Sequence, residues 1–306
     1  MRNIEHMPEP ENMLEQEPTK EKGANVSVRM KFIRHGERTK TSELTDYGRE
    51  VTRKKAKESG LKGEGFDAVK PYGSQQGPKA DVEALPGSRV GMARALETAY
   101  IYTEEVRAED KKYTARSKGL LNFETLKIKA PYEHVPVYNS NLPENYDSLS
   151  EADKAEAAKR AQSATVNHLL SLDTPQADQY RKETAGAFAK IVNQRIRLSE
   201  RLNSGSKVLL VEGTHGPMPE LLLKEALVRE TVGGQKTFGF KDIDEIGGPL
   251  YPSESIDAIV ERDEKGVLRK IRVELDPAKA RPEGEMYLDL EKLDELEKFY
   301  DQIHKE

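Results

Sequence analysis

The apolar positions along the chain fall into runs typical of buried strands and spacings typical of helices. Residues 26–33 and 207–211 are apolar enough to predict strands that are covered on both faces. Thr45 is suited to cap a helix that ends near Gly60, and residues 66–69 predict a short second strand. This alternation of strands and helices predicts an α/β fold with a mostly parallel sheet.

After about residue 150, the sequence contains signals for helix starts, a hairpin and a closing helix. Thr174 is followed by a proline, as at many helix starts, and Ser150 lies three residues before an aspartate, which resembles a capping box. Residues 256–275 alternate between apolar and charged positions around a turn that contains Gly266, and so predict a β-hairpin. The leucine spacing in residues 290–303 predicts an amphipathic closing helix.

Three parts of the chain differ in character. Residues 1–25 are rich in Glu, Pro, Asn and Lys without hydrophobic periodicity, and we expect a disordered tail. Residues 26–306 are expected to form the α/β domain. Within that domain, the charged helices between about residues 124 and 204 interrupt the core strands, and so predict a helical cap over one end of the sheet.

Composition narrows the choice of function. The 306 residues have a formal net charge of -5, and the charges are well mixed, so we expect no nucleic-acid partner. The absence of cysteine excludes disulfides, thiol catalysis and cysteine-based zinc sites, and we expect no metal. Without a signal peptide or an apolar run of transmembrane length, we expect a cytoplasmic protein with no membrane partner.

Two histidines follow the two apolar strands. Ligands of parallel sheets bind beyond the carboxyl ends of the strands, so His35 and His215 are expected at one site. Arg34 and Arg38 flank His35, and planar guanidinium groups are suited to binding two phosphate oxygens at once. Nearby cations also lower the pKa of a histidine and so keep the imidazole neutral and nucleophilic. This pattern favours a phosphate-monoester site, although the same residues could be surface arginines beside a core histidine.

Four short motifs, in this order, resemble those of the histidine phosphatase superfamily, which includes the cofactor-dependent phosphoglycerate mutases. They are Ile-Arg-His-Gly-Glu-Arg (33–38), Leu-Thr-Asp-Tyr-Gly (44–48), Arg-Ala-Leu-Glu-Thr-Ala (94–99) and Val-Glu-Gly-Thr-His-Gly (211–216). Each motif is short, but together they span roughly residues 28–225. The resemblance implies a three-layer α/β/α sandwich of the phosphoglycerate mutase type.

The resemblance also implies a role for each site residue. His35 is the phosphorylated nucleophile, and His215 stabilises the charge of the transition state. The phosphate-binding residues are Arg34, Arg38, Arg94 and His215. The implied proton donor is Glu124, within Leu-Asn-Phe-Glu, with Glu37 and Asp46 as the alternatives.

The chain departs from the mutases after the first motif, where Arg38 and Thr39 replace a small residue and an asparagine. Because a mutase has to hold its cofactor and exclude water, this departure favours hydrolysis. The sequence therefore predicts a phosphomonoester hydrolase without a cofactor, acting on a phosphorylated small molecule or protein. A phosphoglycerate-type phosphomutase and a non-catalytic phospholigand-binding protein remain the alternatives.

Overall fold

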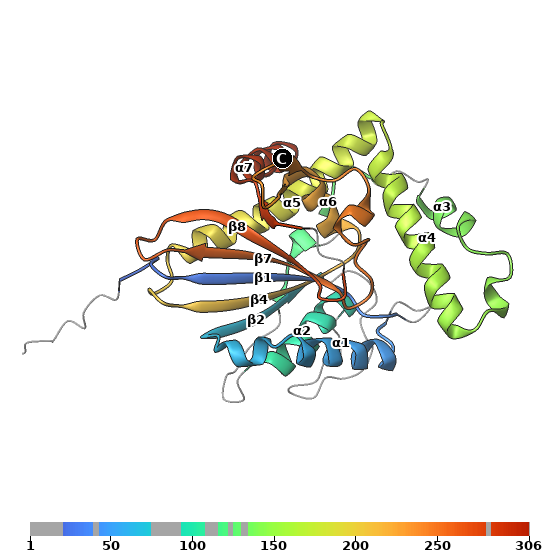
Figure 1. Ribbon diagram of the computed structural model, residues 1–306, viewed down its shortest axis with the longest axis horizontal. Helices are drawn as coiled ribbons and strands as arrows, with labels where there is room; N and C mark the ends of the chain where they lie inside the picture. The colour runs from blue at the N-terminus through green and yellow to red at the C-terminus, as the bar shows by residue number, and fades with distance from the viewer. Residues whose placement is uncertain are drawn as a thin grey trace, which may run out of the picture.

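In the computed structural model, helices cover both faces of one sheet, as expected for a three-layer α/β/α arrangement (Figure 1). The structure describes residues 21–38, 43–74, 93–107, 116–121, 125–129, 134–279 and 283–305. The strands are β1 (Ser27–Arg34), β2 (Ala68–Gly73), β3 (Arg116–Ser117), β4 (Lys207–Thr214), β5 (Leu227–Glu230), β6 (Lys236–Phe238), β7 (Ser255–Arg262), β8 (Leu268–Leu275) and β9 (Glu285–Leu288). The helices are α1 (Asp46–Glu58), α2 (Arg94–Val106), α3 (His134–Ser140), α4 (Glu151–Ser171), α5 (Pro175–Ser199), α6 (Met218–Ala226) and α7 (Leu290–Ile303).

The sheet is mixed, which corrects the expectation of a mostly parallel one. Its strand order over the described residues is β3-β2-β4-β1-β7-β8-β9-β5-β6. The four strands from β3 to β1 run parallel, whereas every pairing from β1–β7 to β5–β6 is antiparallel. The turn between β7 and β8 reverses the chain and makes that pair antiparallel, and β7 also runs antiparallel to its other neighbour, β1.

The two faces of the central strands bury different side chains. Along β4, Leu210 faces the cluster that contains Phe188 of α5, and Leu209 faces the cluster on the side of α1 and α2. Phe32 of β1 packs against Phe188 with ring centroids 5.2 Å apart. Burial on both faces explains why β1 and β4 are nearly continuous apolar runs.

Most of the predicted elements form. Thr45 caps α1 by accepting a hydrogen bond from Gly48 N–H, and Gly266 takes a φ of +73° in the turn between β7 and β8. The second strand starts at Ala68, two residues later than expected. Residues 21–25, placed in the predicted tail, contact the domain, since Gly205 N–H donates to Ala24 O at 2.9 Å. Residues 1–20 lie outside the described part of the chain, so the disordered tail stays a prediction.

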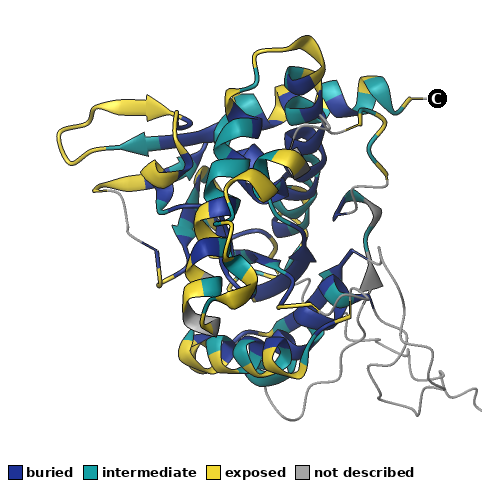
Figure 2. Ribbon diagram, turned by 90° about the vertical axis from the view of Figure 1, so that its right-hand side faces the viewer, coloured by how far each residue is buried: buried dark blue, intermediate teal, exposed yellow. Residues whose placement is uncertain are grey.

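The helical insertion is smaller than expected. α3 and α4 lie beyond the end of the sheet toward which β1 and β4 run (Figure 1). α5, which lies within the predicted cap, instead packs on the sheet and against α7. Figure 2 shows buried residues concentrated where the helices meet the sheet, and exposed ones along the outer sides of the helices. The cap is therefore built from α3, α4 and the segment between them.

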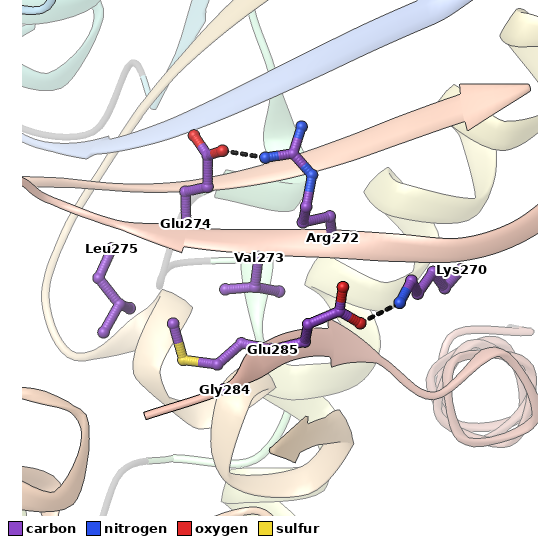
Figure 3. A pocket seen from close by; sticks show the side chains of 8 residues that line it. Lys270, Arg272, Val273, Glu274, Leu275, Gly284 and Glu285 are labelled. Atoms are coloured by element: carbon purple, nitrogen blue, oxygen red, sulfur yellow. Dashed lines mark hydrogen bonds and ion pairs between the residues drawn. The ribbon is translucent and has the colours of Figure 1, made fainter. Parts of the chain in front are cut away.

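A small hollow opens in the antiparallel half of the sheet. β8 and β9 pair at two positions only and then diverge, which leaves a space of about 170 Å³. The hollow is lined by Val273, Leu275 and Met286, with ion pairs Lys270–Glu285 and Arg272–Glu274 at its rim (Figure 3). The predicted site residues do not line this hollow.

Over the described residues, the structure contains no helix that is both long and apolar enough to span a membrane. The cytoplasmic location stays a prediction from the sequence.

Candidate functional site

The two motif histidines lie side by side at the ends of neighbouring parallel strands. Arg34, the last residue of β1, is in register with Thr214, the last residue of β4, and His35 N–H donates to Thr214 O at 3.0 Å. The rings of His35 and His215 have centroids 5.1 Å apart and meet edge to face at 64°. Both rings are buried. The expected proximity of the two histidines is therefore confirmed.

The hydrogen bond that His35 makes determines which of its nitrogens can react. Its Nδ1 lies 2.8 Å from the carbonyl oxygen of Gly36, which can only accept, so Nδ1 carries the proton. Burial lowers the pKa of His35 well below its usual value, and the charges of Arg34 and His215 lower it further. A neutral imidazole with a proton on Nδ1 has an unprotonated Nε2. Nε2 is therefore available as a nucleophile.

The guanidinium group of Arg34 has a hydrogen-bond partner at one nitrogen and, in the described part of the chain, none at another, buried nitrogen. Its Nη1 donates to Leu250 O at 2.6 Å, whereas its buried Nε has no hydrogen-bond partner among the described residues. Burial lowers the pKa of Arg34, although the charges of Glu220 and Glu254 act in the opposite direction. A buried guanidinium nitrogen without an acceptor is costly, and an anion bound beside the two histidines would satisfy it.

The other two predicted arginines lie close enough to act on the same groups. Burial lowers the pKa of Arg94, and repulsion from Arg38 and Arg34 lowers it further. Burial also lowers the pKa of His215 to about 3, together with the charges of Arg94, Arg34 and Arg38. The predicted phosphate-binding residues therefore lie close enough to influence one another electrostatically, although Arg38 is exposed and Glu220 and Glu254 act on Arg34 as well.

The third motif holds α2 against the ends of β1 and β4. Gly36 N–H donates to Thr98 Oγ1 at 3.0 Å, and the same hydroxyl donates to Arg94 O at 2.8 Å. An added Cβ at Gly213 would overlap the carbonyl group of Ala95. This close approach sets the start of α2, and with it Arg94, beside the histidines.

The second motif supports the loop that carries His35. Thr45 N–H donates to Glu37 O at 3.0 Å, and an added Cβ at Gly48 would lie only 2.6 Å from that oxygen. Thr52, one turn further along α1, donates to Gly48 O at 2.8 Å. The start of α1 therefore buttresses residues 36–38, and this motif has a positioning role.

The proton donor is the least defined part of the site. Glu124 lies outside the described residues, so its role stays a prediction. Of the two alternatives, Asp46 is fully exposed and forms an ion pair with Arg49 at 2.9 Å. Glu37 is exposed in the loop that follows Gly36. Neither alternative is linked to the histidines by a hydrogen bond or an ion pair in the described part of the chain.

Three contacts of the site were not predicted from the sequence. Ser74, directly after β2, has its Oγ 3.0 Å from His215 Nε2. Leu250 binds through its backbone alone: its carbonyl accepts from Arg34, and its N–H donates to Glu220 Oε1 at 2.8 Å. Gln162 of α4 donates to the same carbonyl at 2.9 Å, which links the cap to Arg34. A serine after a strand and a backbone contact leave no distinctive pattern in a sequence.

Metal-binding groups are absent from the described residues, where no three His, Cys, Asp or Glu side chains could hold an ion. The expectation of a metal-free site stays a prediction.

Comparisons with known proteins give weak likenesses only. No model of a known family matches the chain, and no curated protein matches it. Among solved structures, a mycobacterial glucosyl-3-phosphoglycerate phosphatase is 13% identical over 83% of this chain and 100% of its own, with a TM-score of 0.38. The protein histidine phosphatase SixA, complexed with tungstate, is 12% identical over 82% of this chain and 97% of its own, with a TM-score of 0.31.

A phosphoserine phosphatase from Entamoeba histolytica, in complex with 3-phosphoglyceric acid, is 16% identical over 80% of this chain and 96% of its own, with a TM-score of 0.34. Likenesses of this size determine neither the fold nor the activity of this chain.

Proposed function

We propose that this chain is a phosphomonoester hydrolase of the histidine phosphatase superfamily, acting through a phosphohistidine on His35. The observation that carries the proposal is the buried pair His35 and His215, with ring centroids 5.1 Å apart at the ends of β1 and β4. The pKa of His35 is lowered by burial and by the charges of Arg34 and Arg94, which supports a neutral nucleophile near cations, as phosphoryl transfer requires.

In the proposed reaction, Nε2 of His35 attacks the phosphorus of the monoester and forms a P–N bond while the P–O bond to the leaving alcohol breaks. A carboxylic acid, which we assign to Glu124, donates a proton to the departing oxygen. Water then attacks the phosphohistidine, the same carboxylate accepts a proton from that water, and the P–N bond breaks to release phosphate. His215 and the arginines stabilise the charge on the transferring phosphoryl group.

The nucleophile is tested with a panel of phosphomonoesters, including p-nitrophenyl phosphate, on the wild type and on His35→Ala. We expect the substitution to abolish phosphate release. His168→Ala, a histidine substitution at the far end of the cap helix α4, serves as the matched control and is expected to keep wild-type activity. Full activity of His35→Ala would overturn the proposal.

The proton donor is tested by comparing leaving groups. Glu124→Gln is expected to slow the hydrolysis of alkyl phosphates more than that of aryl phosphates, because a poor leaving group depends more on protonation. An equal loss of activity for both classes of substrate would exclude Glu124 as the acid, and Glu37 would be the next candidate.

The competing functions have their own readouts. With 3-phosphoglycerate and 2,3-bisphosphoglycerate, isomerisation faster than phosphate release would favour a phosphomutase. Tight binding of inorganic phosphate without turnover of any monoester would favour a non-catalytic phospholigand-binding protein.

A further inference from the structure

The last strand at one edge of the sheet is exposed along its whole length. β6 lies outside β5 in the strand order, and Lys236, Thr237 and Phe238 are all exposed. The described residues expose only four large apolar side chains, and two of them, Val232 at 96% and Phe238 at 69%, belong to this hairpin. A free edge can pair with another strand, and an edge as short as this one, with a lysine on it, can pair only weakly.

The hydrogen bonds between β5 and β6 define which backbone groups remain free. Gly239 N–H donates to Leu227 O at 2.7 Å, and Thr231 N–H donates to Gln235 O at 3.0 Å. Hydrogen-bonded pairs alternate with non-bonded pairs along an antiparallel ladder. Thr237, midway between Gln235 and Gly239, therefore directs its backbone groups toward β5.

Lys236 and Phe238 consequently direct their N–H and C=O groups away from β5, toward the free edge. Among the described residues, none bonds to these outward groups. The edge thus presents two donors and two acceptors, with Thr237 at its centre. This set is complementary to itself when a second copy is turned by 180° about Thr237.

We propose that β6 pairs antiparallel with β6 of a second copy of this chain, about a two-fold axis through Thr237. Lys236 then lies opposite Phe238 of the second copy, and the four outward groups of each strand form four hydrogen bonds. The two sheets become one continuous sheet across the dimer.

The side chains favour this register. Residues that lie opposite each other in an antiparallel pair project from the same face of the sheet, so the aliphatic part of Lys236 comes beside the Phe238 ring of the second copy. The Lys236 ammonium itself lies 5.8 Å from the ring centroid of Tyr287 in its own chain. Glu230 lies 3.8 Å from the Lys236 ammonium and reduces repulsion between the two lysines. Val228 and Tyr287, in register with Phe238 along the same row, extend the apolar contact.

The dimer is expected to be weak. A three-residue ladder with one aromatic pair lies at the low end of specific interfaces, below about 1,200 Å² of buried surface. We therefore expect a dissociation constant on the order of 10–100 μM, which analytical ultracentrifugation can measure.

A cysteine introduced on the proposed axis tests the geometry directly, since the chain has no cysteine of its own. Thr237 faces its counterpart as a non-hydrogen-bonded pair, with Cα atoms about 4.5 Å apart, which is within the range of a disulfide. Thr237→Cys should therefore form a covalent dimer on mild oxidation. Val267→Cys, at an exposed position in the other hairpin, is the control and should remain monomeric. Equal crosslinking of both variants, or none of Thr237→Cys, would overturn the proposal.

A second pair of variants tests the edge without a crosslink. Lys236→Pro removes one outward N–H but no bond to β5, whereas Lys236→Ala removes the side chain only. We expect the proline to weaken self-association at least tenfold more than the alanine, with thermal unfolding confirming that both variants fold. A wild type that stays monomeric at several hundred μM would contradict the dimer, whatever its activity as a phosphatase.

Discussion

At the residue scale, the chemistry depends on one proton of His35. The carbonyl of Gly36 holds that proton on Nδ1, and burial beside Arg34 and His215 keeps the ring neutral. A protonated imidazole could not attack a phosphate, so in the proposed reaction the arginines that would bind the substrate would also keep His35 in its reactive form.

Thr98 has a positioning role that can be tested alone. Its hydroxyl accepts from Gly36 N–H and donates to Arg94 O, so Thr98→Val leaves a buried N–H unsatisfied. We expect the free energy of unfolding to fall by about 1–3 kcal/mol and kcat/KM to fall at least tenfold, because the His35 loop and Arg94 lose their common anchor. Thr98→Ser keeps the hydroxyl and should stay near the wild type; an equal loss in both variants would refute this role.

His215 should make the stability depend on pH. Its pKa is about 3 in the folded protein against about 6.5 in the unfolded chain. Below pH 6.5 the unfolded state binds more protons, so stability falls as the pH drops through the interval between these two values. Lowering the pH from 7.5 to 5 should therefore reduce the free energy of unfolding by about 2 kcal/mol through this histidine.

Urea unfolding of His215→Gln at the same two pH values checks this linkage. The loss of stability between pH 7.5 and pH 5 should be smaller than in the wild type by about 2 kcal/mol. An unchanged difference between the two pH values would show that His215 is not the group responsible.

At the scale of elements, the site depends on how closely α2 approaches the sheet. Gly213 of β4 meets the backbone of Ala95, and Gly73 of β2 meets that of Leu96. These glycines let the helix start directly over the strand ends, where a larger residue would hold it away. Arg94 can reach the histidines only because of this approach.

Gly213→Ala tests this contact. The added methyl group would overlap the Ala95 carbonyl, so we expect a loss of more than about 2 kcal/mol of stability and a sharp fall in kcat/KM. Gly63→Ala is the matched control, because an added Cβ there meets nothing within 4 Å and the φ is not positive. Chemical denaturation should show Gly63→Ala within about 0.5 kcal/mol of the wild type. Similar losses at both positions would argue against a specific role for the α2 contact.

Leu250 connects three elements through its backbone. Arg34 at the end of β1 and Gln162 on α4 both donate to its carbonyl, and its N–H donates to Glu220 on α6. Burial raises the pKa of Glu220, because the charged carboxylate is less stable there than in water. Arg34 and the cap are therefore held by the same carbonyl group.

At the scale of the whole molecule, the formal net charge of -5 contrasts with the positive site. The charges of Arg34 and Arg38 lower the pKa of Arg94, so these guanidinium groups repel one another, and an anion bound between them would reduce that repulsion. Binding of a ligand to the folded state alone stabilises it by mass action.

Inorganic phosphate should therefore raise the melting temperature. At about 100 times the dissociation constant the stabilisation is about 2.7 kcal/mol, which corresponds to a shift of roughly 4 °C for a chain of this length. Arg94→Gln should lose most of this shift, which differential scanning fluorimetry can follow. Arg269→Gln, an exposed arginine on β8, should keep it. An equal shift in all three proteins would mean that phosphate acts elsewhere.

Sequence alone determined the parts of this protein that depend on local chemistry. The buried strands β1 and β4, the cap of α1 by Thr45 and the turn at Gly266 follow from burial, side-chain capping and backbone freedom within a few residues. His35, His215, Arg34 and Arg38 follow from local patterns as well, because strand ends and guanidinium groups can be recognised in the chain, whereas the role of Arg94 is implied only by the resemblance of its motif.

Tertiary structure alone decided what depends on residues that are distant in sequence. The pairing of the β7–β8 hairpin with β1 made the sheet mixed, and the packing of α5 on the sheet reduced the cap. Ser74 reaches His215, and Leu250 binds Arg34, only because the chain folds back on itself. A hydroxyl and a backbone carbonyl acquire such roles through position, and position depends on the summed packing of the whole molecule.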